Sequence, residues 1–232
     1  MTTHEEWVIK CPGCERAYDL FWISSGNNFG GKFWSDGCSV SNCRYPLTGL
    51  YSCPRCHWVF TIGDCEKIDP DDPTVEELFA SRYSWRPKKE PREGERRKRY
   101  ADEVRLEKCA ALLHLRRWAP QNDFEPILRL GWWWADESED RKHALGVEDA
   151  LKAGKEPSLL LSERTIGNMQ RLTEVLPSGP KKALIVGEVQ RRLGQFDLAI
   201  EASSQMPSHQ SELSSQLIAL SQHGYRTVVR LK

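Results

Sequence analysis

The sequence lacks the features of membrane and exported proteins. It has no apolar run close to the roughly 20 residues that span a bilayer. Its start, Met-Thr-Thr-His-Glu-Glu, has no basic segment followed by an apolar core. We therefore expect a cytoplasmic protein without a membrane contact. Disulfides are not expected either, because they persist mainly in oxidising compartments.

A charge excess of either sign is also missing. The chain carries 33 Lys and Arg residues against 33 Asp and Glu, a formal net charge of +0. Dedicated nucleic-acid-binding proteins normally show a clear basic excess. Nucleic acid is therefore possible as a partner but not favoured.

The common catalytic motifs are absent as well. No Gly-x-Ser-x-Gly, phosphate-binding glycine loop, His-Glu-x-x-His or paired-carboxylate motif occurs. The six histidines are scattered along the chain without ligand spacing. We therefore expect that the protein is not an enzyme.

What the sequence does contain is one short pattern in two copies, Cys11-Pro12-Gly13-Cys14 and Cys53-Pro54-Arg55-Cys56. A Cys-x-x-Cys turn places two thiolates at the spacing of metal ligands, and two such turns supply the four sulfurs that a tetrahedral zinc ion binds. Each proline stiffens its turn and leaves the following N–H groups free to point at sulfur. The pattern predicts one structural Zn²⁺ bound by Cys11, Cys14, Cys53 and Cys56.

Other interpretations of the cysteines remain open. Cys11 and Cys14 alone could form a thioredoxin-like redox centre, although no βαβ alternation surrounds them. Cys38 and Cys43 lie between the two pairs and could replace one pair or form a second partial site. Their spacing favours bystander thiols. His57 directly follows the second pair, and we expect it to be a turn residue rather than a ligand.

Hydrophobic patterning predicts an α+β protein with three parts. Residues 6–62 alternate short β-type runs with turns, so that each cysteine pair lies at a hairpin tip, and we expect a zinc-ribbon module over 1–68. Residues 69–99 read as a short helix opened by Asp72-Pro73 and a basic linker. Residues 100–232 read as an α-helical, repeat-like domain.

The linker over 86–99 holds eight Lys or Arg residues against three Glu. It could bind phosphates, or it could be solvated and run into the exposed face of a helix. The second interpretation is favoured, because no aromatic residue is interleaved with the charges.

Helical periodicity marks the C-terminal part at several places. One helix is expected around Cys109 and Leu113, ending before Pro120, and the next is expected to begin at a cap on Asn122 or Asp123. The latter should carry one apolar face, and its three consecutive tryptophans cannot all share one side. The face consists of Phe124, Ile127, Leu128, Gly131, Trp134 and Ala135.

The clearest helical unit is a hairpin over 183–200. Gly187 should allow close helix contact and Gly194 should form the turn, at offsets that resemble a tetratricopeptide repeat. We expect Arg191 and Arg192 to face outward, where they could bind a partner's carboxylates or be solvated. A last helix over Leu213–Leu220 should be followed by an uncapped tail.

These residues together resemble bacterial proteins of domain-of-unknown-function family 2225. The likeness rests on both cysteine pairs with the approach Pro46-Leu47 and Tyr51, on the segment Leu128-Arg129-Leu130-Gly131-Trp132, and on Gly187-Glu188 with Arg191-Arg192-Leu193-Gly194. Glu15 and His57 follow the cysteine pairs where the family commonly has glycine. The resemblance implies zinc and a helical-repeat scaffold, and it implies no known activity.

Taken together, the sequence predicts a non-enzymatic zinc-binding module that binds another protein through its helical domain, as an interaction or scaffolding protein. The first alternative is a nucleic-acid-associated zinc-ribbon protein that uses the strip 86–99. The second is a cytosolic thiol redox protein that works through Cys11 and Cys14.

Overall fold

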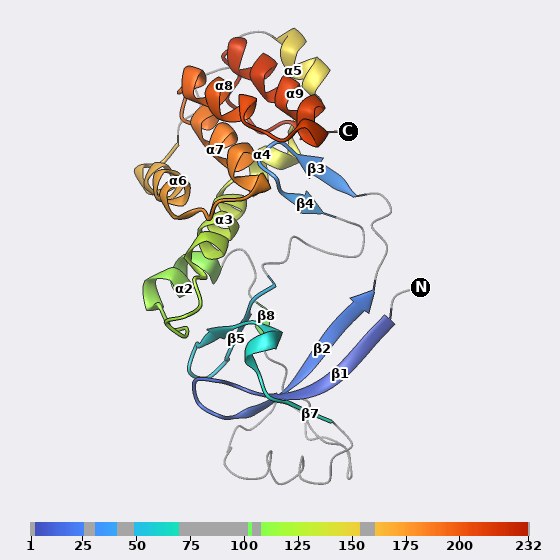
Figure 1. The fold of residues 1–232 in the computed structure, drawn as a ribbon, viewed down its shortest axis with the longest axis vertical. Helices are drawn as coiled ribbons and strands as arrows, with labels where there is room; N and C mark the ends of the chain where they lie inside the picture. The colour runs from blue at the N-terminus through green and yellow to red at the C-terminus, as the bar shows by residue number, and fades with distance from the viewer. Residues whose placement is uncertain are drawn as a thin grey trace. The chain divides into compact units, whose positions relative to one another are not determined.

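The computed structural model describes residues 3–25, 31–40, 49–69, 102–103, 108–153 and 161–231. Figure 1 shows these elements as a ribbon. The predicted helix after Asp72, the basic strip 86–99 and Cys43 lie outside the described residues. In the described part of the chain, none of the helices combines the length and apolar character needed to cross a membrane.

The chain divides into two compact units that are not consecutive in sequence. The first unit takes residues within Met1–Asn27, Gly49–Val104 and His114–Asn122, and the second takes residues within Asn28–Thr48, Arg105–Leu113 and Asp123–Lys232. These units do not coincide with the predicted division at 68 and 99. Residues 31–40, which lie between the two cysteine pairs in sequence, belong to the second unit.

The first unit consists of two small antiparallel sheets. One has the strand order β2-β1-β7, from β1 (Thr3–Lys10), β2 (Ala17–Ser25) and β7 (Lys67–Ile68). The other has the order β6-β5-β8, from β5 (Tyr51–Ser52), β6 (Val59–Phe60) and β8 (Asp102–Glu103), with a 3-10 turn η1 (Ile62–Asp64) after β6. Lys10 pairs with Ala17 and Ser52 pairs with Val59, so each predicted cysteine turn closes a hairpin.

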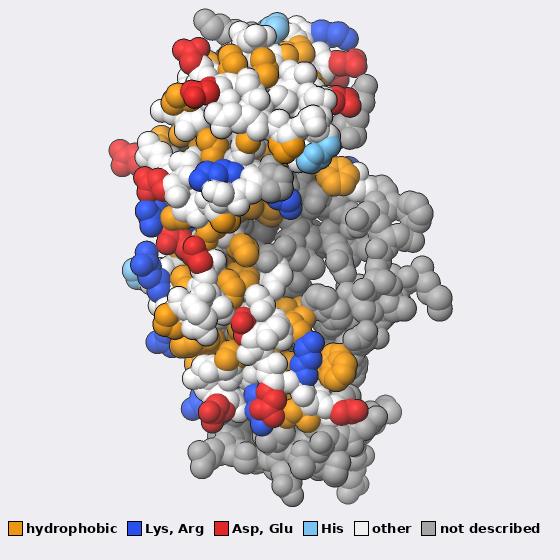
Figure 2. Space-filling view, in the orientation of Figure 1, with side chains coloured by type: hydrophobic (Ala, Val, Ile, Leu, Met, Phe, Trp, Pro, Cys, Tyr) orange, Lys and Arg blue, Asp and Glu red, His pale blue; other side chains and the backbone are white. Residues whose placement is uncertain are grey.

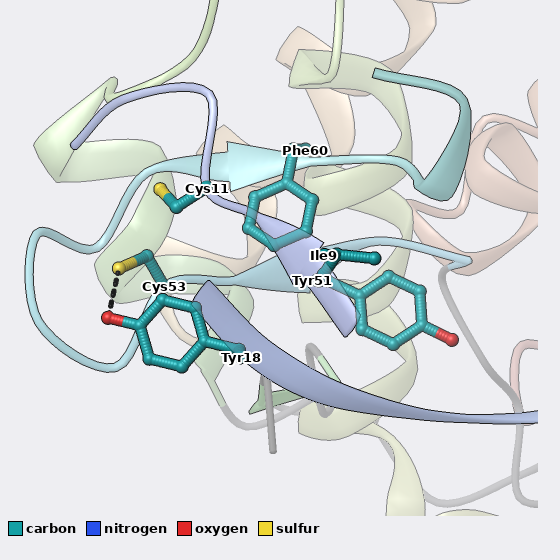
Figure 3. Close-up of a cluster of buried hydrophobic side chains, with 6 residues drawn as sticks. All are labelled: Ile9, Cys11, Tyr18, Tyr51, Cys53 and Phe60. Atoms are coloured by element: carbon teal, nitrogen blue, oxygen red, sulfur yellow. Dashed lines mark hydrogen bonds between the residues drawn. The ribbon is translucent and has the colours of Figure 1, made fainter. Parts of the chain in front are cut away.

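The core of the first unit is small and includes cysteine. Its buried members are Ile9, Cys11, Tyr18, Tyr51, Cys53 and Phe60 (Figure 3). The rings of Tyr51 and Phe60 face each other across the β5–β6 pair with centroids 6.2 Å apart. Apolar strand residues therefore pack directly against the sulfur atoms.

The second unit is mainly helical. Its helices are α3 (Glu125–Asp136), α4 (Ser138–Lys142), α5 (Val147–Ala153), α6 (Glu163–Val175), α7 (Pro180–Arg192), α8 (Phe196–Ser204) and α9 (Ser211–Gln222), with the 3-10 turn η3 (Ser208–Gln210) before α9. A sheet of order β4-β3-β9 joins β3 (Lys32–Trp34), β4 (Ser39–Val40) and β9 (Arg230–Leu231). Helix α2 (Cys109–Leu115) spans the boundary between the units, and it buries Cys109, Leu112 and Leu113 as predicted.

The predicted hairpin is present as α7 and α8. Gly194 adopts φ +78° in the turn, a conformation that favours glycine. A Cβ at Gly187 would lie 2.7 Å from Ser203 Oγ and 3.4 Å from the carbonyl oxygen of Ala199, so the two helices need glycine there. Both glycine predictions are confirmed.

Helix α3 differs from the prediction in two details. It begins at Glu125 after Phe124, whose side chain makes no capping hydrogen bond, so the predicted cap on Asn122 or Asp123 is wrong. Of the three consecutive tryptophans in α3, the fully buried one is Trp133, whereas the prediction placed Trp134 on the apolar face. The three tryptophans have different neighbours, as predicted: the Trp134 indole donates to the Asp36 carbonyl, and the Arg164 guanidinium lies over the Trp132 ring.

Two predictions about the C-terminal half are wrong. Arg191 and Arg192 do not face outward, because both are 0% exposed and form ion pairs inside the second unit. The segment after α9 is not an uncapped tail. It buries Tyr225, Val228 and Val229 and ends in β9, which pairs with β3.

Candidate metal centre

The four predicted cysteines meet in the first unit. The sulfur atoms of Cys11, Cys14, Cys53 and Cys56 all lie within 4.8 Å of one another. The Cys11–Cys56 and Cys14–Cys53 sulfur pairs are each 3.7 Å apart. A tetrahedral ion with Zn–S bonds of about 2.3 Å requires sulfurs about 3.8 Å apart. All four cysteines are free of disulfides, so the donor set fits a tetrahedral thiolate-binding metal.

The two turns have the same backbone geometry. In the first, the Cys11 N–H donates to the Arg16 carbonyl and its own carbonyl accepts from the Glu15 N–H, both at 2.8 Å. In the second, Cys53 makes the matching bonds to Trp58 and His57, both at 2.9 Å. The fifth residue of each turn is left-handed, with φ +57° at Glu15 and +58° at His57. The sequence repeat is therefore also a structural repeat.

Backbone N–H groups point at the first sulfur of each turn. The Gly13 N–H donates to Cys11 Sγ and the Cys56 N–H donates to Cys53 Sγ, both at 3.4 Å. Such bonds favour the thiolate form that a metal requires. This confirms that the turns free their N–H groups for sulfur.

The turns differ at their third residue. A Cβ at Gly13 would lie 2.6 Å from ring atoms of Trp58, which packs directly over that position. The equivalent residue of the second turn is Arg55, which is exposed. The glycine in the first turn is therefore required by packing rather than by the cysteine spacing.

The surroundings shift the pKa values of the cysteines in different directions. Hydrogen bonding with the Cys11 thiol, together with the Cys56 N–H and the Tyr18 hydroxyl, lowers the pKa of Cys53 to about 4. The same bond to Cys53, followed by burial, raises the pKa of Cys11. Burial raises the pKa of Cys56 to about 11. Hydrogen bonds within the cluster thus favour the thiolate form at Cys53, the form in which a cysteine binds metal.

Sequence reasoning missed two residues that support the cluster. The Tyr18 hydroxyl lies 3.2 Å from Cys53 Sγ (Figure 3), and burial raises the pKa of Tyr18, so it remains a proton donor to the thiolate. Arg117 donates to the Cys56 carbonyl at 2.7 Å, and its own carbonyl accepts from the Val59 N–H at 2.7 Å. Tyr18 could have been found from its place on β2 just after the first turn. Arg117 is too far away in sequence to give a signal.

The remaining described cysteines and His57 stay outside the cluster. Cys38 packs with Trp34 and Val228 in the second unit, and burial raises its pKa to about 12. Cys65 donates its S–H to the Thr61 carbonyl at 3.5 Å, and Cys109 is buried in α2. His57 is exposed. The structure therefore brings neither Cys38 nor His57 into the four-sulfur cluster.

The comparisons with known proteins add no relative. No protein-family model matches the chain, and no curated protein or solved structure is similar to it. The resemblance to domain-of-unknown-function family 2225 therefore stays a prediction.

Proposed function

We propose that this protein is a non-enzymatic zinc protein whose Cys11, Cys14, Cys53 and Cys56 hold one structural Zn²⁺ in a zinc-ribbon module. The observation that carries the proposal is the meeting of four sulfurs within 4.8 Å from two turns of the same geometry. Four thiolates complete a tetrahedral shell, so no coordination position is left for a substrate or an activated water. The role that fits such a site is to stabilise the fold.

A stabilising metal also meets a need of the first unit. Among its described residues, the cluster that packs around the sulfurs has six buried members, two of which are the cysteines Cys11 and Cys53. Sheets this small bury too little apolar surface to fold well alone, and a metal commonly supplies the missing free energy. The zinc is therefore proposed to be a condition for folding of the first unit.

For the protein as a whole we propose an interaction or scaffolding role carried by the helical unit. The buried Arg191 and Arg192 cannot serve as its contact surface. The outward face of α8 takes their place in the proposal, with Leu198 49% exposed between the exposed Asp197 and Glu201. A partner for this face would combine an apolar contact with basic groups.

Metal content tests the core of the proposal. Purified protein should contain about one zinc per chain by elemental analysis, and Cys53→Ser should lose it. Cys65→Ser is the matched control, because a serine hydroxyl can still donate to the Thr61 carbonyl and the residue lies outside the cluster. Full metal content in Cys53→Ser, or no zinc uptake by wild-type protein, would contradict the proposal.

The redox alternative is weakened by burial. In a Cys-x-x-Cys oxidoreductase an accessible thiolate must attack a substrate disulfide. The cysteine with the lowered pKa is Cys53, which is 0% exposed, as is Cys11. A redox role through Cys11 and Cys14 predicts that one of these two thiols reacts rapidly with iodoacetamide in the protein as purified, without added chelator, whereas a zinc-bound structural site predicts slow alkylation of both.

The nucleic-acid alternative gains no support from the described surface. On the face drawn in Figure 2, acidic and basic side chains of the described residues are interspersed. Binding of generic DNA that falls steeply with salt, and that is lost when Arg96, Arg97, Lys98 and Arg99 are neutralised, would favour this alternative.

A further inference from the structure

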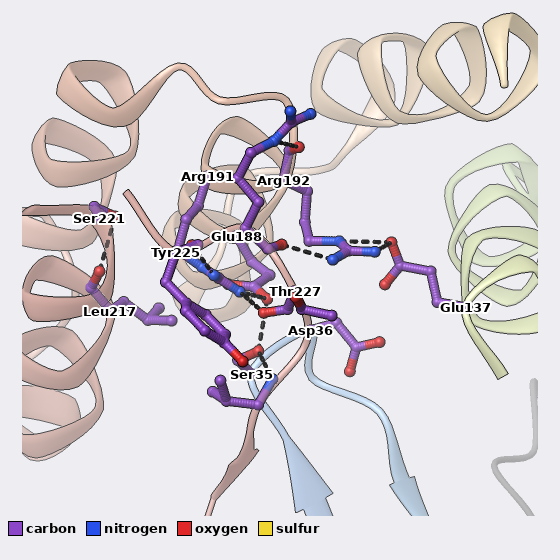
Figure 4. Close-up of polar contacts among 12 residues, drawn as sticks. Ser35, Asp36, Glu137, Glu188, Arg191, Arg192, Leu217, Ser221, Tyr225 and Thr227 are labelled. Carbon is purple, nitrogen blue, oxygen red and sulfur yellow. Dashed lines mark hydrogen bonds and ion pairs between the residues drawn. The ribbon is translucent and has the colours of Figure 1, made fainter. Parts of the chain in front are cut away.

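The segment that follows α9 is held mainly through its backbone. The carbonyls of Tyr225 and Thr227 accept hydrogen bonds from Arg191, the second at 2.8 Å, and the carbonyl of Arg226 accepts from Arg192 at 2.6 Å (Figure 4). The two guanidiniums therefore bind three consecutive backbone carbonyls just before β9.

The guanidiniums are held in place by buried carboxylates. Glu188 accepts two hydrogen bonds from Arg191, at 2.9 and 2.6 Å. Arg192 donates to Glu137 at 2.8 Å and to Asp140 at 2.9 Å. Each guanidinium has five N–H donors, and the carboxylates leave some of them pointing at the segment. Without it, buried donors would be unsatisfied, which is costly.

Residues 31–40 contact the next part of the segment. The Ser35 hydroxyl donates to Glu188 at 2.6 Å and accepts from the Val229 N–H at 3.2 Å. The Ser35 N–H donates to the Val229 carbonyl at 2.9 Å, and the Arg230 N–H donates to the Leu145 carbonyl at 2.8 Å. Glu188 thus connects the arginine contacts to the β3–β9 pairing through Ser35.

We propose that Glu188, Arg191 and Arg192 form a binding site for peptide backbone carbonyls, occupied in this chain by its own residues 225–231. We call this segment the C-terminal strap. The two arginines of the site donate hydrogen bonds to three consecutive carbonyls. The buried side chains of Tyr225, Val228 and Val229 add apolar contact. The Gly187-Glu188 and Arg191-Arg192 pattern is then a receptor inside the fold rather than a surface for a partner.

Conservative replacement of the arginines tests the site in the full-length protein. Lysine keeps the charge, but its three donors sit on one nitrogen, which cannot reach a carboxylate and two separate carbonyls as the guanidinium does. In Arg191→Lys, the amides of Val229 and Arg230 should exchange with solvent at least tenfold faster than in wild type, while the amides of α8 change much less. Trypsin should then cut after Arg226 or Arg230.

Arg129→Lys is the matched control. Arg129 is a partly buried arginine of the same unit that bonds Glu125 and Asn168 and does not contact the strap. It should leave exchange of the strap amides unchanged.

Ser35→Ala provides a second variant that leaves every charge in place. It removes the bonds to Glu188 and Val229, and exchange should rise at β3 and in the strap together. The proposal is overturned if the strap amides of Arg191→Lys keep their wild-type rates, or if they accelerate only in step with α8. It is also overturned if Ser35→Ala leaves the strap protected.

Discussion

The two units differ in the kinds of ionisable side chain that each brings together. The first gathers four cysteine sulfurs within 4.8 Å of one another, and each becomes negative when it loses its proton. The second buries three carboxyl groups together with three guanidiniums: Asp36, Glu137 and Glu188 with Arg141, Arg191 and Arg192. The metal that we propose would balance the charge of the cysteine cluster, whereas the ionic cluster holds equal numbers of acidic and basic groups. The difference predicts that the two units respond differently to metal, mutation and pH.

Removal of the metal should have the largest effect. Structural zinc contributes about 10–16 kcal/mol in small zinc-folded peptides, more than a small sheet can replace. With a strong chelator, amides of β1, β2, β5 and β6 should lose hydrogen-exchange protection, while those of α7, α8 and α9 keep it. Retained protection in the four strands after complete zinc removal would show that the metal is not structural.

Breaking the ionic cluster should have the next largest effect, in the second unit. Asp36 accepts from Arg141 Nε at 2.8 Å and from the Cys38 N–H at 3.0 Å, and Asp36→Ala leaves the buried Arg141 charge with the Trp134 carbonyl but without its carboxylate partner. Loss of one partner of a buried pair typically costs about 3–5 kcal/mol. Urea unfolding should show this loss, with zinc content unchanged.

The double variant Asp36→Leu/Arg141→Met is the control for that experiment. Apolar replacement of both members of a buried pair is often close to neutral. It should therefore recover much of the stability, and a loss equal to that of Asp36→Ala would contradict the assigned pairing.

Acidification should change the stability of the two units in opposite directions. Burial raises the pKa of Glu137 to about 7 from its ordinary 4.5. The folded state then holds the proton more tightly, so this group favours folding below pH 4.5 and the benefit is lost as the pH rises through 7. The cysteine site should instead be destabilised at low pH, because its ligands must lose protons to bind metal.

Glu137→Gln isolates the contribution of that carboxyl. Between pH 8 and 4.5, wild-type protein should gain on the order of 3 kcal/mol relative to the variant, at about 1.4 kcal/mol for each pKa unit. Denaturant unfolding of the second unit over this range measures the difference, and identical pH profiles would refute it. Zinc release should increase over the same acidification.

Crowding at the α7–α8 contact should cost less. Gly187→Leu places a side chain against Ser203 Oγ and the Ala199 carbonyl, and overpacking of this kind costs about 1–3 kcal/mol. The melting temperature should fall by several degrees, with zinc content intact. Gly167→Ala in α6 is the control, since no atom lies within 4 Å of the added Cβ, and it should be neutral or slightly stabilising.

The smallest expected effect concerns the left-handed residues of the cysteine turns. Glu15→Gly and His57→Gly remove the strain of φ +57° and +58° but add freedom to the unfolded chain. We expect a gain of at most about 1 kcal/mol for either change. The two gains should be alike because the turns share one geometry, and clearly unequal gains by thermal unfolding of zinc-loaded protein would contradict that equivalence.

Much of the local structure could be predicted from short spacings. Cys11 and Cys14, or Cys53 and Cys56, lie within one turn, so their geometry hardly depends on the rest of the chain. The α7–α8 hairpin is similar, because Gly187 and Gly194 fix a close contact and a turn within one local unit. Boundaries were less predictable, since the cap of α3 follows its tertiary packing and not the nearest polar residue.

The sequence by itself therefore determined the α+β composition, the four-cysteine cluster and the helical hairpin. Only the tertiary structure decided that residues 31–40 belong with the helices, that the C-terminal strap completes a sheet, and that Arg191 and Arg192 are buried. The physical reason is that a charged side chain can be buried only where partners satisfy it. Arg191 has one partner nearby, Glu188 of the same helix, but the other partners of the two arginines are Glu137 and the carbonyls of 225–227. Those residues are distant in the chain, and no periodic pattern connects them to α7.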